Sequence, residues 1–86
     1  MVKIWVKIML NQRISSDFIF ESPLSLTADN FFEMVRELCG KADIPTPLIL
    51  NSHIKHFKSF NQCKFKKSDF VESVRFDELV LENATE

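Results

Sequence analysis

The sequence predicts an α+β domain, a three- to four-stranded antiparallel sheet with two helices on one face, in the element order β-β-α-α-β. Three observations lead to this fold class. Residues 2–22 alternate between apolar and polar positions, residues 26–43 carry a helical apolar stripe, and residues 70–82 alternate again. A chain of 86 residues with 45% hydrophobic content can build one modest core, so we expect a single domain over 1–86.

The first expected element is a strand over residues 2–10, "VKIWVKIML". Its apolar face holds Val2, Ile4, Val6, Ile8 and Leu10, and its second face holds Lys3, Trp5, Lys7 and Met9. "ISSDFIFES" alternates again after the polar "NQR", which predicts an antiparallel hairpin. The sequence leaves the register of this hairpin open. The face of Trp5 is joined either by Ile14, Phe18 and Phe20 or by Ile19 with Ser15, Asp17 and Glu21.

The clearest expected helix lies in residues 26–43, "LTADNFFEMVRELCGKAD". Thr27 suits the N-cap position, where its hydroxyl satisfies a free backbone N–H. The apolar stripe consists of Phe31, Val35, Leu38, Cys39 and Ala42. Gly40 suits a C-terminal cap, although the alternative is a helix that runs one turn further.

Two prolines in "IPTPLILNS" predict an extended connection, in which Leu48–Leu50 form a short strand or an apolar plug. Asn51 or Ser52 then caps a second helix, whose Ile54, Phe57 and Phe60 are expected to form a narrow buried stripe. The following "NQCKFKKSD" reads as a loop or as a short edge strand anchored by Phe65.

The last expected strand is "FVESVRFDELVLE", residues 70–82. Val74 and Phe76 share one parity, while Leu79 and Leu81 have the other. This slip predicts a β-bulge at Asp77 or Glu78, or else two short strands with a turn between them. The expected core over the whole chain is Ile4, Val6, Ile8, Phe18, Phe20, Phe31, Val35, Leu38, Phe57, Val74 and Phe76.

Four segments, "VKIWVKIM", "PLIL", "HIKHFK" and "SDFVESVRFDELVLE", together resemble a small bacterial family of uncharacterised proteins of about this length. The resemblance spans nearly the whole chain and implies one intact domain of bacterial, cytoplasmic origin. The family has no assigned activity, cofactor or catalytic residue, so the resemblance implies no role for any position.

Composition argues against several kinds of site. A single glycine cannot build a phosphate-binding loop, and we expect no cofactor. His53, His56 and Cys63 offer at most three ligands where zinc needs four, so we expect no metal, and the histidines are taken as exposed. Lysines interrupt the apolar N-terminus, so we expect neither a signal peptide nor a membrane contact. The expected location is therefore a reduced, cytoplasmic compartment.

The basic stretch of residues 53–67, "HIKHFKSFNQCKFKK", contains no acid. Its lysines, Lys55, Lys58, Lys64, Lys66 and Lys67, are candidate polyanion contacts. We favour a buried phenylalanine stripe under lysine stems, with the acidic segment 69–86 neutralising the charge. Nearby lysines favour a thiolate at Cys63, but the sequence identifies no base and no oxyanion hole beside it. We therefore interpret Cys63 as an incidental surface thiol and expect that the chain is not an enzyme.

The function expected from the sequence is therefore a small interaction or self-associating module. Its candidate surface is the second face of the hairpin, with Lys3, Trp5, Lys7, Met9 and Ile19, because interfaces favour Trp and Met. The expected partner is a second copy or an unidentified protein, and no small-molecule ligand is indicated. The less favoured alternative is a nucleic-acid-binding accessory protein that uses residues 53–67.

Overall fold

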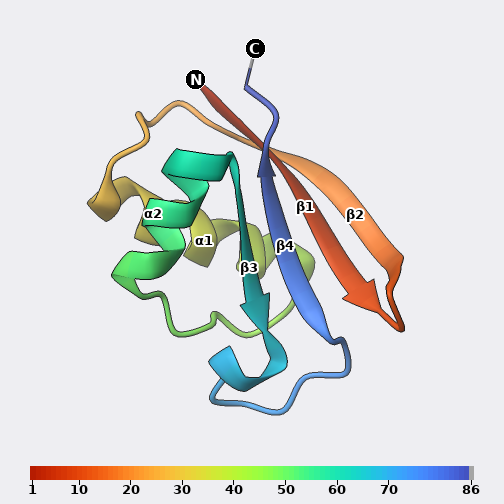
Figure 1. Ribbon diagram of the computed structural model, residues 1–86. Helices are drawn as coiled ribbons and strands as arrows, with labels where there is room; N and C mark the ends of the chain where they lie inside the picture. The colour runs from red at the N-terminus through yellow and green to blue at the C-terminus, as the bar shows by residue number, and fades with distance from the viewer. Residues whose placement is uncertain (86) are drawn as a thin grey trace.

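The computed structural model describes residues 1–85 and has two layers, a four-stranded antiparallel sheet and two helices packed on one of its faces (Figure 1). The strands are β1 (Val2–Leu10), β2 (Arg13–Ser22), β3 (Gln62–Lys66) and β4 (Glu78–Asn83), in the spatial order β2-β1-β4-β3. The helices are α1 (Ala28–Ala42) and α2 (Asn51–Phe60), and a 3₁₀ turn, η1 (Lys67–Asp69), follows β3. The predicted α+β class is confirmed, and the segment after α2 is the edge strand β3.

The β1–β2 hairpin turns at Asn11 and Gln12, which both have positive φ. This is the conformation that the right-handed twist of a two-residue hairpin requires, here without glycine. The register pairs Trp5 with Ile19 and Ile4 with Phe20, so Ile19 joins the face of Trp5. A register shift after Ile8 is the one irregularity in the β1–β2 ladder.

Helix α1 begins as predicted, with Thr27 as its N-cap and the Asn30 N–H donating to the Thr27 hydroxyl at 3.2 Å. It ends at Ala42, where Asp43 adopts the left-handed conformation. The expected cap at Gly40 is therefore wrong, and the longer alternative is right. The buried residues of α1 are Phe31, Met34, Val35, Leu38 and Cys39.

Helix α2 begins differently from the prediction, because Leu50 occupies its N-cap. The Leu50 N–H donates to Nδ1 of His53 at 2.9 Å, so the histidine ring satisfies the backbone of the N-cap residue itself. Asn51 and Ser52, the expected caps, lie within the helix. The preceding connection is neither a strand nor a plug. Leu48 and Leu50 are more than half exposed, and Ile49 alone of the three is partly buried.

The predicted stripe on α2 is correct for Ile54 and Phe57, which are buried, and wrong for Phe60, which is 70% exposed. The physical reason is the helical repeat. Steps of three residues fall short of a full turn by about 60°, so Phe60 lies roughly 120° around the helix from Ile54. The chain then turns at Asn61, in the left-handed conformation, into β3.

The core lies between the helices and the face of the sheet that carries Ile4, Phe20, Phe65 and Leu79. The predicted core is confirmed as buried at Ile4, Val6, Phe20, Phe31, Val35, Leu38, Phe57, Val74 and Phe76. Ile8 and Phe18 are only partly buried. They lie toward the hairpin end, which extends beyond the helices (Figure 1).

The C-terminal segment differs from both predictions, because only Glu78–Asn83 is a strand. Val74 and Phe76 are buried from an irregular loop, in which the rings of Phe70 and Phe76 meet edge to face at 5.2 Å. The apparent slip in parity therefore marks the boundary between this loop and β4, and no bulge is needed to explain it.

Candidate functional site

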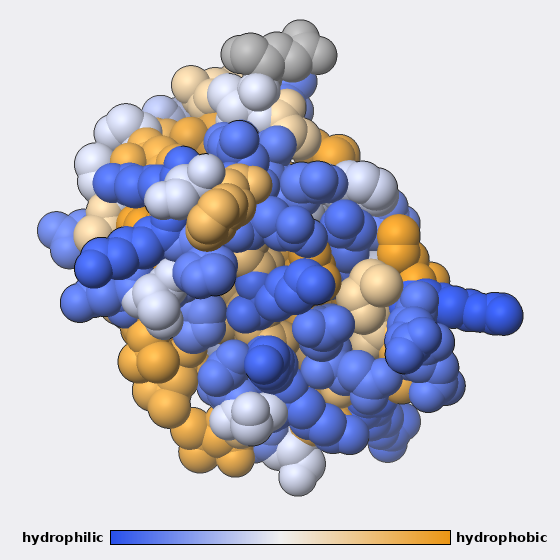
Figure 2. All heavy atoms as spheres, viewed as in Figure 1, coloured by the Kyte–Doolittle hydropathy of each residue, from blue (hydrophilic) through white to orange (hydrophobic). Residues whose placement is uncertain are grey.

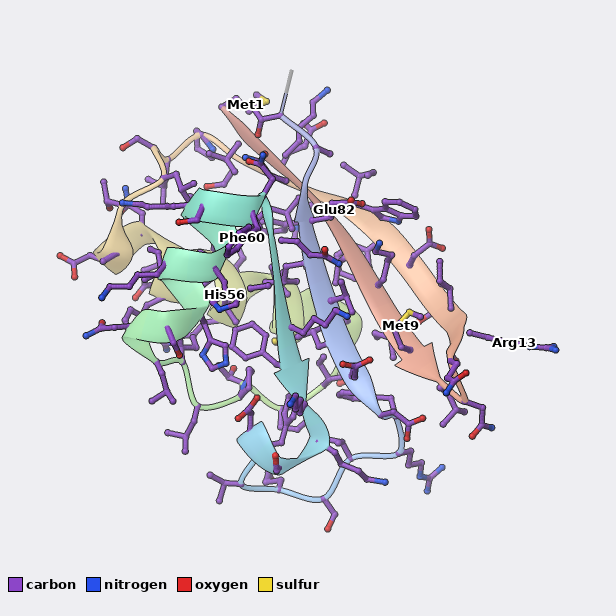
Figure 3. All side chains as sticks on the ribbon, in the orientation of Figure 1. Met1, Met9, Arg13, His56, Phe60 and Glu82 are labelled. Carbon is purple, nitrogen blue, oxygen red and sulfur yellow. The ribbon has the colours of Figure 1, made fainter. Side chains whose placement is uncertain are left out.

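The predicted surface on the hairpin is brought together as expected. Lys3, Trp5, Lys7 and Met9 share the face of the sheet that the helices leave open, and Ile19 lies directly opposite Trp5. On the other side of β1, the same face continues with Glu78 and Glu82 of β4, and Figure 3 labels Glu82. The structure thus confirms that these five residues lie on one face, and it leaves their role as a prediction.

The polar groups of this open face are largely paired within the chain. Trp5 Nε1 donates to an Asp17 carboxylate oxygen at 2.8 Å, and the Lys7 ammonium lies 4.2 Å from the Trp5 ring centroid. Lys7 also contacts Glu82 at 3.4 Å. Lys3 lies 3.9 Å from a Glu21 carboxylate oxygen, so Asp17 and Glu21 on β2 both have partners on their own chain.

Self-association through the open face stays a prediction, and we expect Trp5→Lys to reduce it. The substitution removes the ring from an apolar patch and adds a positive charge beside Lys7. Sedimentation at tens of micromolar is the measurement, with Lys55→Gln on the outer side of α2 as a control. A single species at the monomer mass for wild type and both variants would contradict the prediction.

A second surface is a groove of about 730 Å³ between α2, β3 and η1. It will be called the α2–β3 groove. Its lining residues are Leu50, Ser52, His53, His56, Phe60, Gln62, Cys63, Lys64, Lys66, Ser68 and Asp69. Figure 3 shows His56 and Phe60 on α2 close to β3, and their rings lie 5.3 Å apart.

The lining of the groove combines polar side chains with exposed apolar side chains at both ends of α2. Leu50 precedes the helix and Phe60 ends it, and both are more than half exposed. In Figure 2, which has the view of Figure 1, hydrophobic atoms interrupt a mostly hydrophilic surface in the region of α2 and the segment before it. This combination of an apolar anchor and a polar border is typical of protein-binding sites.

His53 and Asp69 connect the start of α2 to the end of β3. Because Nδ1 of His53 accepts the Leu50 N–H, the neutral ring carries its proton on Nε2, which lies 3.7 Å from an Asp69 carboxylate oxygen. The same carboxylate accepts the Lys66 N–H at 2.8 Å. The ring of His53 packs on Phe65 at 4.2 Å, so this histidine is largely buried and not exposed as predicted.

The two cysteines are both buried, which corrects the expected surface position of Cys63 and confirms Cys39 as a small hydrophobe. Burial raises the pKa of each thiol to about 12. The lysines near Cys63 in sequence therefore do not stabilise a thiolate. Both nitrogens of His53 are also engaged, so it offers no base to this thiol.

The basic residues of the stretch 53–67 separate in space. Lys64 and Lys66 border the groove, whereas Lys55 and Lys58 lie on α2 outside its lining, and Lys67 begins η1. Among residues 1–85, none of these five lysines forms an ion pair within 4.0 Å. The expected neutralisation by the acidic segment therefore involves no direct ion pair of these lysines in this part of the chain, although Nε2 of His53, in the same stretch, lies 3.7 Å from an Asp69 carboxylate oxygen.

The described residues contain no cluster of three or more side chains with metal-binding chemistry. Neither helix in residues 1–85 has the length and apolar content needed to cross a bilayer. The α2–β3 groove was missed in the sequence because Phe60 was assigned to the core. The available signal was that "HIKHFKSFNQCKFKK" joins a helix directly to a strand.

Comparison of the chain with protein-family models, with curated proteins and with solved structures found no match. The resemblance to a bacterial family therefore stays an expectation from the sequence.

Proposed function

We propose that this chain is a non-enzymatic interaction module that binds a segment of another protein in the α2–β3 groove. The observation that carries the proposal is the groove itself, which opens beside an edge strand and exposes 70% of Phe60 on its rim. Exposed aromatic side chains beside a concave surface are the usual anchors of protein interfaces.

The groove supports this function better than the open sheet face does. On the open face, Trp5 and Lys7 already have partners on β2 and β4, and a bound protein would have to break or cover these contacts. At the groove, Lys64 forms no ion pair among residues 1–85, and Phe60 is 70% exposed although its ring meets that of His56. Binding at the groove therefore removes water from fewer polar groups that already have partners, and so costs less free energy than binding at the open face.

Binding of single-stranded nucleic acid is a second candidate, and the exposure of Phe60 favours it. Lysines can neutralise phosphates while an exposed ring stacks on a base, and Phe60 lines the same groove as Lys64 and Lys66. One exposed ring is a small platform, because such proteins stack successive bases on several aromatic side chains. The net charge of −1 also gives no general attraction for a polyanion.

Selection of short random peptides on the immobilised protein tests the proposed function. We expect peptides that bind the wild type and lose binding to Phe60→Ser. The matched control is Phe32→Ser, because Phe32 is also a partly exposed phenylalanine on a helix but does not line the groove. Neither substitution removes a core side chain, so both variants are expected to fold.

Two results would contradict the proposal. One is the absence of any enriched peptide, and the other is equal binding of the enriched peptides to wild type and Phe60→Ser. A single-stranded RNA oligonucleotide serves as the second probe. If it binds at physiological salt and the variant with Lys64, Lys66 and Lys67 replaced by glutamine loses that binding, the nucleic-acid candidate takes precedence.

A further inference from the structure

The outer edge of β3 presents backbone groups that have no partner within residues 1–85. Asn83 N–H donates to the Asn61 carbonyl at 2.7 Å, and Lys67 N–H donates to the Asp77 carbonyl at 3.1 Å. Because hydrogen-bonded positions alternate along an antiparallel pair, the odd-numbered residues of β3 direct their backbone groups to β4. The even-numbered residues, Gln62, Lys64 and Lys66, therefore direct theirs away from the sheet.

One of these outward groups is already satisfied. The Lys66 N–H donates to the Asp69 carboxylate at 2.8 Å, where η1 folds back against the end of the strand. The remaining outward groups are the N–H and C=O of Gln62 and Lys64 and the C=O of Lys66. This is the spacing of donors and acceptors that a further strand requires, and η1 marks the end at which that strand stops.

The two sides of this edge differ in chemistry. The side chains of Gln62, Lys64 and Lys66 lie on the open face of the sheet, opposite Glu82, Val80 and Glu78 of β4. On the other side lies the part of the α2–β3 groove that is lined by the rings of His56 and Phe60. Since successive side chains of a strand point to opposite faces, a strand added here would place alternate residues against the lysines and against the groove.

Charge decides what such a strand should contain. Lys64 and Lys66 have no acid within 4.0 Å in residues 1–85, and acidic side chains opposite lysine stabilise a strand pair. A second copy of β3 is a poor occupant. Pairing two β3 edges about a two-fold axis brings the lysines of both copies together on one face.

We propose that the occupant of the α2–β3 groove is an extended segment of a partner protein that adds to the edge of β3 as a fifth strand. Its residues alternate between acidic side chains, which face Lys64 and Lys66, and apolar side chains, which enter the groove beside Phe60. This inference rests on the proposed function and specifies the chemistry and conformation of the partner. Backbone hydrogen bonds supply affinity in this mode of binding, and the alternating side chains supply specificity.

A synthetic peptide of alternating glutamate and valine, with blocked ends, is the probe. We expect it to bind the wild type at physiological salt and to slow hydrogen exchange at the Gln62 and Lys64 amides, as measured by NMR. The Lys66 amide is the internal control, because its bond to Asp69 already protects it. A lysine–valine peptide and a glutamate–proline peptide, which lacks alternate backbone donors, should bind at least about tenfold more weakly.

Charge reversal is the second arm. The double variant Lys64→Glu with Lys66→Glu should bind the glutamate–valine peptide with about tenfold or more lower affinity, and it should prefer the lysine–valine peptide. Lys55→Glu with Lys58→Glu is the matched control, since it changes the net charge equally but lies outside the groove lining. This control should leave the preference unchanged, and a reversal in it too would show that net charge alone governs binding and overturn the inference.

The outcomes separate this inference from the proposed function. One outcome is that selected peptides require Phe60 for binding but do not slow exchange at the Gln62 and Lys64 amides. That outcome would support the proposed function and overturn strand addition. Protection of β2 amides in place of β3 amides would overturn the site. Dimerisation of the free protein through β3, detected as the same amide protection at high concentration, would replace the partner protein with a second copy.

Discussion

Phe31→Ala is expected to lower the free energy of unfolding by about 3–5 kcal/mol, a large part of the stability of a domain this size. Phe31 is fully buried on α1, and its ring lies 5.4 Å from that of Phe57 on α2. Truncation removes the contact between the helices and leaves a cavity that the surrounding side chains fill only in part. Urea unfolding followed by circular dichroism measures the change.

Phe32→Ala is the matched control for this prediction. Phe32 is the next residue of α1, carries the same side chain and is 41% exposed, so its truncation should cost much less. The two variants lose the same atoms and gain the same intrinsic helix preference, because alanine favours a helix more than phenylalanine does. Equal midpoints for the two variants would show that the apolar face of α1 has been placed incorrectly.

Alkaline pH is expected to destabilise the protein through its two buried thiols. Burial raises the pKa of Cys39 and of Cys63 from 9.0 to about 12, because the thiolate is poorly solvated in the core. Between these values the unfolded chain releases protons that the folded chain retains. The free energy of unfolding therefore falls as pH rises above 9, and this contribution is fully present only at lower pH.

The expected slope is about 1.4 kcal/mol per pH unit for each thiol within this window. Urea unfolding at several pH values measures it, and the double variant Cys39→Ala with Cys63→Ala is the comparison. Lysines also titrate at alkaline pH, but both proteins share them, so the difference between the two slopes isolates the thiols. Parallel pH profiles would mean that the thiols ionise equally in the folded and unfolded states.

Local pattern was sufficient to predict the two strands of the hairpin and the start of α1, but not the register of the hairpin or the end of the helix. Alternation with a period of two determines which residues of β1 share a face, so the grouping of Trp5 with Lys3, Lys7 and Met9 followed directly from the sequence. Thr27 capped α1 as predicted, because the cap forms between residues three apart. The fold class depends on the order of such elements, and it was therefore also predictable.

The groove was decided by tertiary structure. Whether Phe60 lies in the core depends on where α2 ends and how Asn61 turns the chain into β3, and helical spacing alone placed it with Ile54 and Phe57. Val74 and Phe76 are buried from a loop, and a period of two made that loop resemble a strand. Periodicity reports which side chains share a face of one element, whereas an edge, a groove and the burial of a loop depend on distant segments that meet only in the folded chain.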